Sequence, residues 1–132
     1  MISHDKEMTV AQLKKLVSTF VQERDWQQFH TPKNISMALS VEAAELMELF
    51  LWTDTHEGKT STDRFKEQEE AIKDEVADIV YWALAFCNVT EIDLAQAIAH
   101  KMEKNKLKYP AATCKELGAA SAFCIKDKLK KL

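Results

Sequence analysis

The chain has 132 residues, of which 46% are hydrophobic and 30% are charged, and its formal net charge at pH 7 is −3. These values are ordinary for one globular domain with a real core, and the acidic balance excludes a basic surface for duplex nucleic acid. The longest uncharged run, residues 79–90, is too short to span a bilayer, so we expect no membrane segment. Because no signal peptide precedes the first expected helix, we expect a cytoplasmic location.

The scarcity of helix breakers predicts the fold class. Only two glycines and two prolines occur, which favours a few long helices and an all-α protein. The three cysteines, Cys87, Cys114 and Cys124, show no C-x-x-C spacing, which suits a reducing compartment. Cys87 lies in an apolar run and is expected to be a small core residue.

Two helices are expected in the first half of the chain. The first opens at the capping-box pattern Thr9-x-x-Gln12 and runs to about residue 25. The second opens at Thr31 as N-cap, with Pro32 as its first residue, and ends near residue 52. The connection between them carries aromatic side chains that either plug the core or line a pocket.

Two further helices are expected in the second half. The third runs from about residue 62 to 88, after a polar loop. The fourth begins at one of two competing caps, Thr90 or Asp93, and stops before Pro110. Beyond that proline the helical period is lost, and the end of the chain fits a short amphipathic helix. We therefore expect a four-helix domain at 1–110 and a C-terminal tail at 111–132.

Two of these helices carry paired carboxylates one turn apart in otherwise apolar sequence. The run at 39–52, L-S-V-E-A-A-E-L-M-E-L-F-L-W, holds Glu42 and Glu45, and Glu75 and Asp78 repeat the i, i+3 spacing. The apolar neighbours predict that the first of these helices is buried on most sides. A buried carboxylate is costly unless it is paired or bound to metal. Four carboxylates without histidine or cysteine form a hard oxygen site that suits Mg²⁺ or Mn²⁺.

Other interpretations of the acidic residues are open. The carboxylates can pair with lysine or arginine at the rim of the bundle, or serve as the docking face of a non-enzymatic helical interaction module. A di-iron bundle would require Glu-x-x-His on two helices, and neither acidic pair is followed by such a histidine. The fourth helix carries Lys101, Asn105 and Lys108 on one face, as a solvated stripe or as a binding surface.

The acidic pairs and the blocks around them resemble a known family. The blocks are F-V-Q-E-R-D-W-Q-Q-F-H-T-P-K-N, E-A-A-E-L-M-E-L-F-L-W, D-E-V-A-D-I-V-Y-W and D-L-A-Q-A-I-A-H-K-M-E-K-N-K-L-K-Y-P. In this order they resemble the MazG-type all-α nucleoside triphosphate pyrophosphatases, and among these the compact dCTP pyrophosphatase branch. Two positions depart from the family pattern: Val41 replaces the first glutamate of the fuller motif, and Val17 replaces a histidine of cytosine-preferring relatives.

The resemblance implies a four-helix bundle of the all-α NTP pyrophosphatase type, assembled as a homo-oligomer, as a tetramer built from two dimers. It implies Mg²⁺-dependent hydrolysis of a (deoxy)nucleoside triphosphate to a monophosphate and pyrophosphate, as house-cleaning of dCTP-like or non-standard nucleotides. The implied metal ligands are Glu42, Glu45, Glu75 and Asp78, with Glu42 or Glu45 also catalytic. The implied phosphate-binding residues are Lys101, Asn105, Lys108 and Tyr109. The implied base-binding residues are Trp26, Trp52, Trp82 and His30.

Overall fold

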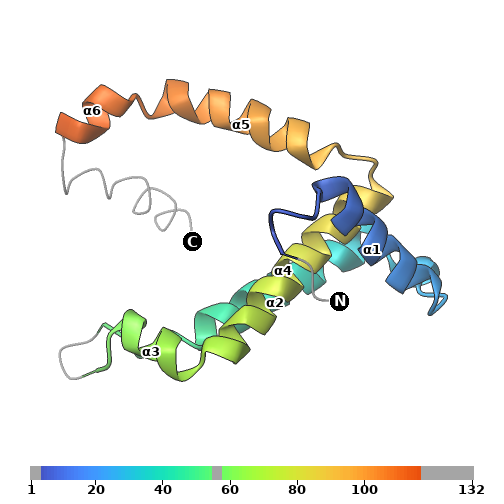
Figure 1. The fold of residues 1–132 in the computed structure, drawn as a ribbon, viewed down its shortest axis with the longest axis horizontal. Coiled ribbons are helices and arrows are strands. Elements are labelled where there is room, and N and C mark those ends of the chain that lie inside the picture. Colours follow the sequence, from blue (N-terminus) through green and yellow to red (C-terminus); the bar gives the residue numbers. More distant parts are fainter. Residues whose placement is uncertain (1–3, 55–57, 117–132) are drawn as a thin grey trace. The chain divides into compact units, whose positions relative to one another are not determined.

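The computed structural model describes residues 4–54 and 58–116, and this part of the chain contains helices and no strand. The elements are α1 (Val10–Gln22), a 3-10 helix (Gln27–Phe29), α2 (Pro32–Glu48), α3 (Ser61–Glu67), α4 (Glu69–Val89), α5 (Leu94–Lys108) and α6 (Ala111–Glu116) (Figure 1). The predicted all-α class is confirmed. None of the helices in the described ranges combines the length and apolar character needed to cross a membrane.

The chain forms two compact units, one reaching to Leu94 and the other starting at Ala95. The first unit holds α1, α2, α3 and α4, and the second holds α5 and α6. The four-helix bundle and the boundary between 1–110 and 111–132 stay predictions. α6 begins directly after Pro110, so the expected loss of the helical period is wrong for residues 111–116. The end of the tail, from residue 117, lies outside the described residues.

The two predicted helix starts in the first half of the chain are confirmed by their caps. Thr9 Oγ1 accepts a hydrogen bond from the backbone N–H of Gln12 at 3.2 Å, and the Gln12 side chain accepts one from the N–H of Thr9 at 2.7 Å. Thr31 Oγ1 accepts from the N–H of Asn34 at 3.2 Å, with Pro32 in the first turn. These side chains satisfy N–H groups that a helix leaves without partners.

The observed helix ends differ from the prediction in three places. α1 ends at Gln22 rather than near residue 25, and Asp25 takes a positive φ of 54°, a conformation that aspartate tolerates better than most residues. α2 ends at Glu48 rather than near residue 52, because the N–H groups of Phe50 and Leu51 bond three residues back instead of four. The predicted third helix is two helices, separated at Gln68, where φ is −124° and ψ is 30°. No glycine or proline marks this break, so the sequence pattern contained no sign of it.

The start of α5 distinguishes between the two competing caps. The helix begins at Leu94, directly after Asp93, and ends at Lys108, before Pro110. The second of the two predicted caps therefore matches the observed start.

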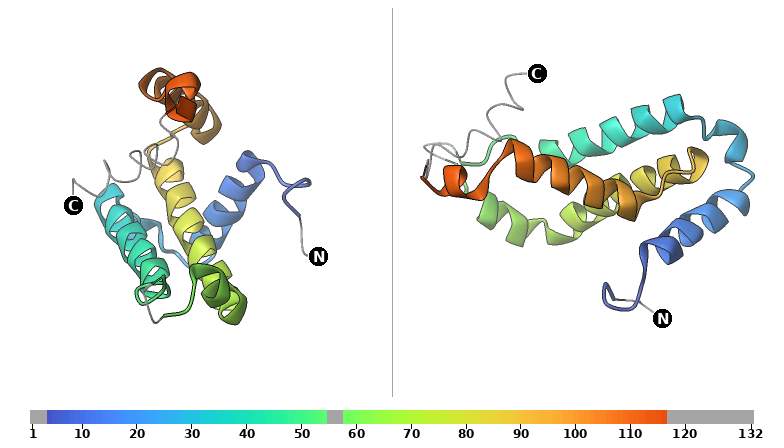
Figure 2. Two further views of the ribbon diagram at one scale, coloured as in Figure 1. Left: turned by 90° about the vertical axis from the view of Figure 1, so that its left-hand side faces the viewer. Right: turned by 90° about the horizontal axis from the view of Figure 1, so that it is seen from above.

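α4 is the central helix of the first unit and contacts both α1 and α2, as the left-hand view of Figure 2 shows. Its apolar side chains meet those of the two flanking helices in a small core. The core consists of Val17, Ile35, Leu84 and Ala85, with Leu13, Tyr81, Trp82, Phe86 and Leu94 packed against it. Ile35 is fully buried and joins α2 to α4. Cys87 is buried, as predicted.

Much of the apolar surface of α2 is not covered by this chain. Ile35 is the one buried residue of the helix, whereas Met37, Val41 and Met47 are each more than half exposed. The prediction that α2 is buried on most sides is therefore wrong for the single chain, because α4 covers only one stripe of it. Large exposed apolar faces of this kind are typical of surfaces that contact a partner.

Candidate metal centre and adjoining groove

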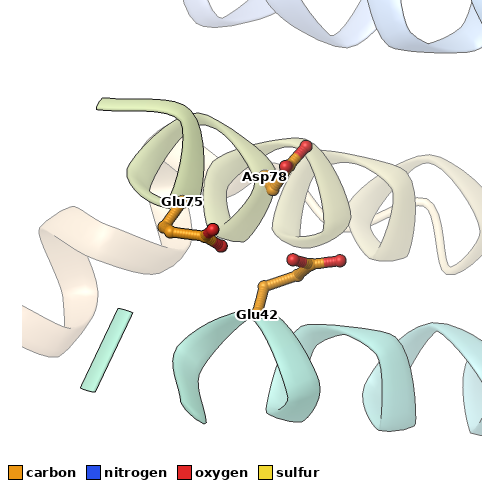
Figure 3. A group of neighbouring side chains, drawn as sticks. All are labelled: Glu42, Glu75 and Asp78. Atoms are coloured by element: carbon orange, nitrogen blue, oxygen red, sulfur yellow. The ribbon is translucent and has the colours of Figure 1, made fainter. Parts of the chain in front are cut away.

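Three carboxylates from α2 and α4 lie close together. Glu42, Glu75 and Asp78 each offer one oxygen, and these oxygens lie within 4.8 Å of one another. Figure 3 shows Glu42 reaching from α2 and Glu75 from α4 toward each other, with Asp78 one turn further along α4. The i, i+3 spacing places the two α4 residues on one helix face. The structure thus brings together three of the four predicted metal ligands.

Glu45, the fourth predicted ligand, lies beside this group rather than within it. A hydrogen bond with Glu42 and the negative charge of Glu42 raise the pKa of Glu45 above its ordinary value. Partial loss of hydration and the charges of Glu75 and Glu48 act in the same direction. The shift shows that negative charge is concentrated at this point of α2.

The cluster fits a divalent cation. No ion pair in the described part of the chain involves any of the four carboxylates. One oxygen of Glu75, Oε2, is buried without a hydrogen-bond partner, which is unfavourable for a carboxylate. Carboxylate oxygens are the ligands that Mg²⁺ and Mn²⁺ prefer. Pairing with lysine or arginine at the rim, the first alternative, does not occur among these residues.

An aromatic groove of about 650 Å³ adjoins the carboxylates. Glu42 and Asp78 form part of its wall, and almost all of the remaining wall is apolar. Phe20 lies edge-on to two other rings of the wall, Trp26 at 5.9 Å and Tyr81 at 6.0 Å between centroids. The volume falls in the range of small-molecule sites, which are mostly apolar with a few polar groups.

The predicted base-binding residues occupy different places. Trp26 and Trp82 line the groove, so the aromatic connection contributes to a pocket wall. His30 is half-buried and stacks on Trp82, with ring centroids 5.5 Å apart. Trp52 is 77% exposed and is not part of the groove wall. The base-binding role of all four residues stays a prediction.

The sequence analysis did not single out two aromatic residues of the groove as site residues. Phe20 belongs to the apolar stripe of α1, and Tyr81 follows Asp78 by one turn. Burial raises the pKa of Tyr81, Arg24 opposes the shift, and the charge of Asp78 adds to it. The signal in the sequence was the i, i+3 spacing of Tyr81 from a predicted ligand. It went unused because an aromatic residue at that spacing is also an ordinary core residue.

The predicted phosphate-binding residues lie on or next to α5, in the second unit. Lys101 and Lys108 are exposed, and Asn105 and Tyr109 are half-buried. The Lys108 ammonium lies 5.0 Å from the centroid of the Tyr109 ring. Lys101, Asn105 and Lys108 are spaced i, i+4 and i+7 on α5, which confirms that these three residues share one face of the helix. Their phosphate-binding role stays a prediction.

Fold and cluster together define an all-α protein with a candidate divalent-cation centre beside an aromatic groove. The sequence also matches the profile of the MazG-like family over residues 37–121, a range that includes all of the clustered carboxylates. The chain belongs to the MazG-like family.

The chain is also similar in sequence to curated proteins and in structure to a solved protein. It is 36% identical over 105 residues to dCTP pyrophosphatase 1 of Mus musculus. The matched region covers 79% of this chain and 61% of that protein. It is 36% identical over 110 residues to dCTP pyrophosphatase 1 of Homo sapiens, covering 83% and 64%. The chain thus spans less than two thirds of the length of these relatives. A pyrophosphatase from Archaeoglobus fulgidus superposes with a TM-score of 0.72 at 34% identity, over 83% of this chain and 99% of that one.

Removing one negative charge from the cluster, or from Glu45 beside it, should not destabilise the metal-free protein. We expect Glu45→Gln and Asp78→Asn to have melting temperatures in EDTA equal to or above that of the parent, because each change relieves like-charge repulsion. Glu103→Gln, which removes a carboxylate paired with Lys106 on α5, is the matched control and should change the melting temperature little. A fall of many degrees for the cluster variants alone would identify their carboxylates as structural partners.

Proposed function

We propose that this protein is a Mg²⁺-dependent nucleoside triphosphate pyrophosphohydrolase that releases a monophosphate and pyrophosphate. The observation that carries the proposal is the meeting of three carboxylates within 4.8 Å beside a groove lined by aromatic rings. Membership of the MazG-like family and the names of the dCTP pyrophosphatase relatives support it. House-cleaning of dCTP-like or non-standard nucleotides is the proposed role.

The charges of the site explain why a metal is required. A triphosphate is strongly anionic and is repelled by Glu42, Glu75 and Asp78 unless cations lie between them. A bound Mg²⁺ would supply positive charge that offsets the negative charge of the phosphates, including the charge that develops in the transition state. Glu42, Glu75 and Asp78 would hold that ion.

The catalytic base is assigned from position. The sequence left Glu42 and Glu45 as alternatives, but Glu42 belongs to the three clustered carboxylates, and Glu45 lies beside them and is exposed. A carboxylate next to the metal ligands is free to orient a water or accept its proton. We therefore assign the base role to Glu45 and the ligand role to Glu42.

The groove is the proposed site of the nucleobase. The rings of Trp26, Tyr81 and Trp82 offer apolar faces against which a base packs. Val17, also in the wall, has no side-chain group that can hydrogen-bond to a base. Cytosine nucleotides are the first substrates to test, since the curated relatives are named for dCTP.

The proposed assembly is a homo-oligomer, a tetramer built as a dimer of dimers. Met37, Val41 and Met47 on α2 and Val76 on α4 are exposed in the single chain. A symmetric partner would bury these faces, and closed symmetric assemblies are the usual solution.

Turnover should release pyrophosphate, rather than orthophosphate, from at least one deoxynucleoside triphosphate with Mg²⁺. The measurement is a panel of nucleotides assayed separately for the two products. Asp78→Asn should lose this activity, because the carboxylate cluster then lacks one charged ligand. Activity unchanged by excess EDTA would contradict the proposal. A complete lack of turnover in the presence of metal would favour the alternative, a non-enzymatic interaction module. Such a module is expected to tolerate Asp78→Asn.

Assembly is checked by light scattering. The monomer mass is 15.1 kDa, and we expect about four times this value at micromolar concentrations. Val41→Lys should lower the measured mass, since a charge in an apolar interface is costly, whereas Lys33→Glu, a charged change at an exposed position of the same helix, should not. A monomer mass for the parent would rule out the proposed oligomer.

Lys101→Ala should lower kcat/KM for the triphosphate about ten- to hundredfold. A hydrogen bond to a charged group contributes about 1.5–3 kcal/mol, whereas an exposed helix charge contributes tenths of a kcal/mol. Lys106→Ala is the matched control, because Lys106 is an exposed lysine of α5 that pairs with Glu103 and lies off the predicted face. A kcat/KM of Lys101→Ala within twofold of the parent would show that this face of α5 is a solvated stripe and does not bind phosphate.

A further inference from the structure

One side-chain hydrogen bond links a predicted metal ligand to the neighbouring helix. The indole Nε1–H of Trp82 on α4 donates to Oε1 of Glu42 on α2 at 3.1 Å. Both groups are half-buried, so this charge-assisted bond is partly shielded from water. Trp82 follows Glu75 and Asp78 at i+7 and i+4, so one face of α4 presents two carboxylates and the donor to the third.

This bond restrains the direction of the Glu42 carboxylate. Glu42 has three rotatable side-chain bonds, and the negative charges of Glu75 and Asp78 repel its carboxylate. The indole N–H holds Oε1 and so limits how the carboxylate of Glu42 can turn. Partners that orient a ligand in this way raise metal affinity because the ligand loses less freedom on binding.

The Trp82 ring in turn packs against the ring of His30. The two rings are stacked, with centroids 5.5 Å apart and planes inclined by 24°. His30 Nδ1 lies 2.8 Å from the carbonyl oxygen of Trp26, so Nδ1 carries the proton and donates it. The imidazole is thereby fixed to the backbone of the connection between α1 and α2.

His30 is connected to Glu42 through Trp82, on which it stacks. The wall of the 650 Å³ groove includes Trp82 but not His30, whose ring lines a smaller cavity of about 170 Å³ together with Asn88. His30 is therefore placed to hold the indole, whereas Trp82 contacts the ligand itself.

We propose that Trp82 and His30 are positioning residues for the metal centre: the Trp82 indole N–H orients Glu42 toward the cation, and the stacked His30 ring fixes the indole. The inference rests on the proposed function, because it requires that Glu42 binds a cation. It gives Trp82 a role in metal affinity that does not depend on a nucleotide.

The test is Mn²⁺ binding by the full chain without nucleotide. Binding is measured by calorimetry and by the loss of the electron paramagnetic resonance signal of free Mn²⁺. Trp82→Phe keeps an aromatic ring and removes the donor, and we expect Mn²⁺ affinity to fall about ten- to hundredfold. Trp26→Phe makes the same chemical change at the other tryptophan of the groove and should leave Mn²⁺ affinity within twofold.

A double variant separates positioning from packing. His30→Leu should weaken Mn²⁺ binding, and Trp82→Phe with His30→Leu should bind no more weakly than Trp82→Phe alone, because both act through one hydrogen bond. Additive losses would overturn the assignment of His30.

The outcomes also separate this inference from the proposed function. A parent protein that binds no Mn²⁺ overturns the metal site itself. A parent that binds Mn²⁺ while Trp82→Phe binds equally well overturns the role of Trp82 alone. Should Trp82→Phe not fold, the indole N–H resonances of the parent are followed by NMR during Mg²⁺ addition. The Trp82 signal should move more than that of Trp26, and an unmoved Trp82 signal overturns the inference.

Discussion

Repulsion between carboxylates is the constraint on which the functional part of this structure depends. Glu42, Glu75 and Asp78 bring oxygens within 4.8 Å of one another, and no lysine or arginine in the described residues pairs with them. Such a cluster is unfavourable by itself, and the apolar contacts of Ile35 and Leu84 hold the two helices together despite it. A cation would turn the repulsion into attraction, so stability and metal binding are coupled here.

The same two helices carry part of the apolar surface that the single chain leaves exposed. Residues such as Val41 and Met47 on α2 and Val76 on α4 face away from the small core. The part of the chain that the structure describes has few buried side chains, so the hydrophobic stabilisation within it is small. The acidic centre and the proposed interface thus share the helices α2 and α4, and assembly would rigidify the ligands as well as cover the apolar faces.

Local sequence signals were sufficient for the fold class and most element boundaries. Thr9 and Thr31 identify helix starts because capping depends on residues only three positions apart. The i, i+3 spacing of Glu75 and Asp78 similarly determines a shared helix face without reference to the rest of the chain. The break at Gln68 was missed because α3 and α4 separate without glycine or proline.

The sequence by itself determined which residue types could form a hard oxygen site and which helices carry them. Only the tertiary structure decided that Glu42, Glu75 and Asp78 meet while Glu45 stays beside them, since this depends on the rotation of α2 against α4. It also decided that Trp82 donates to Glu42 and that Trp52 lies outside the groove. Contacts between residues 40 positions apart follow from the packing of whole helices, which no local pattern encodes.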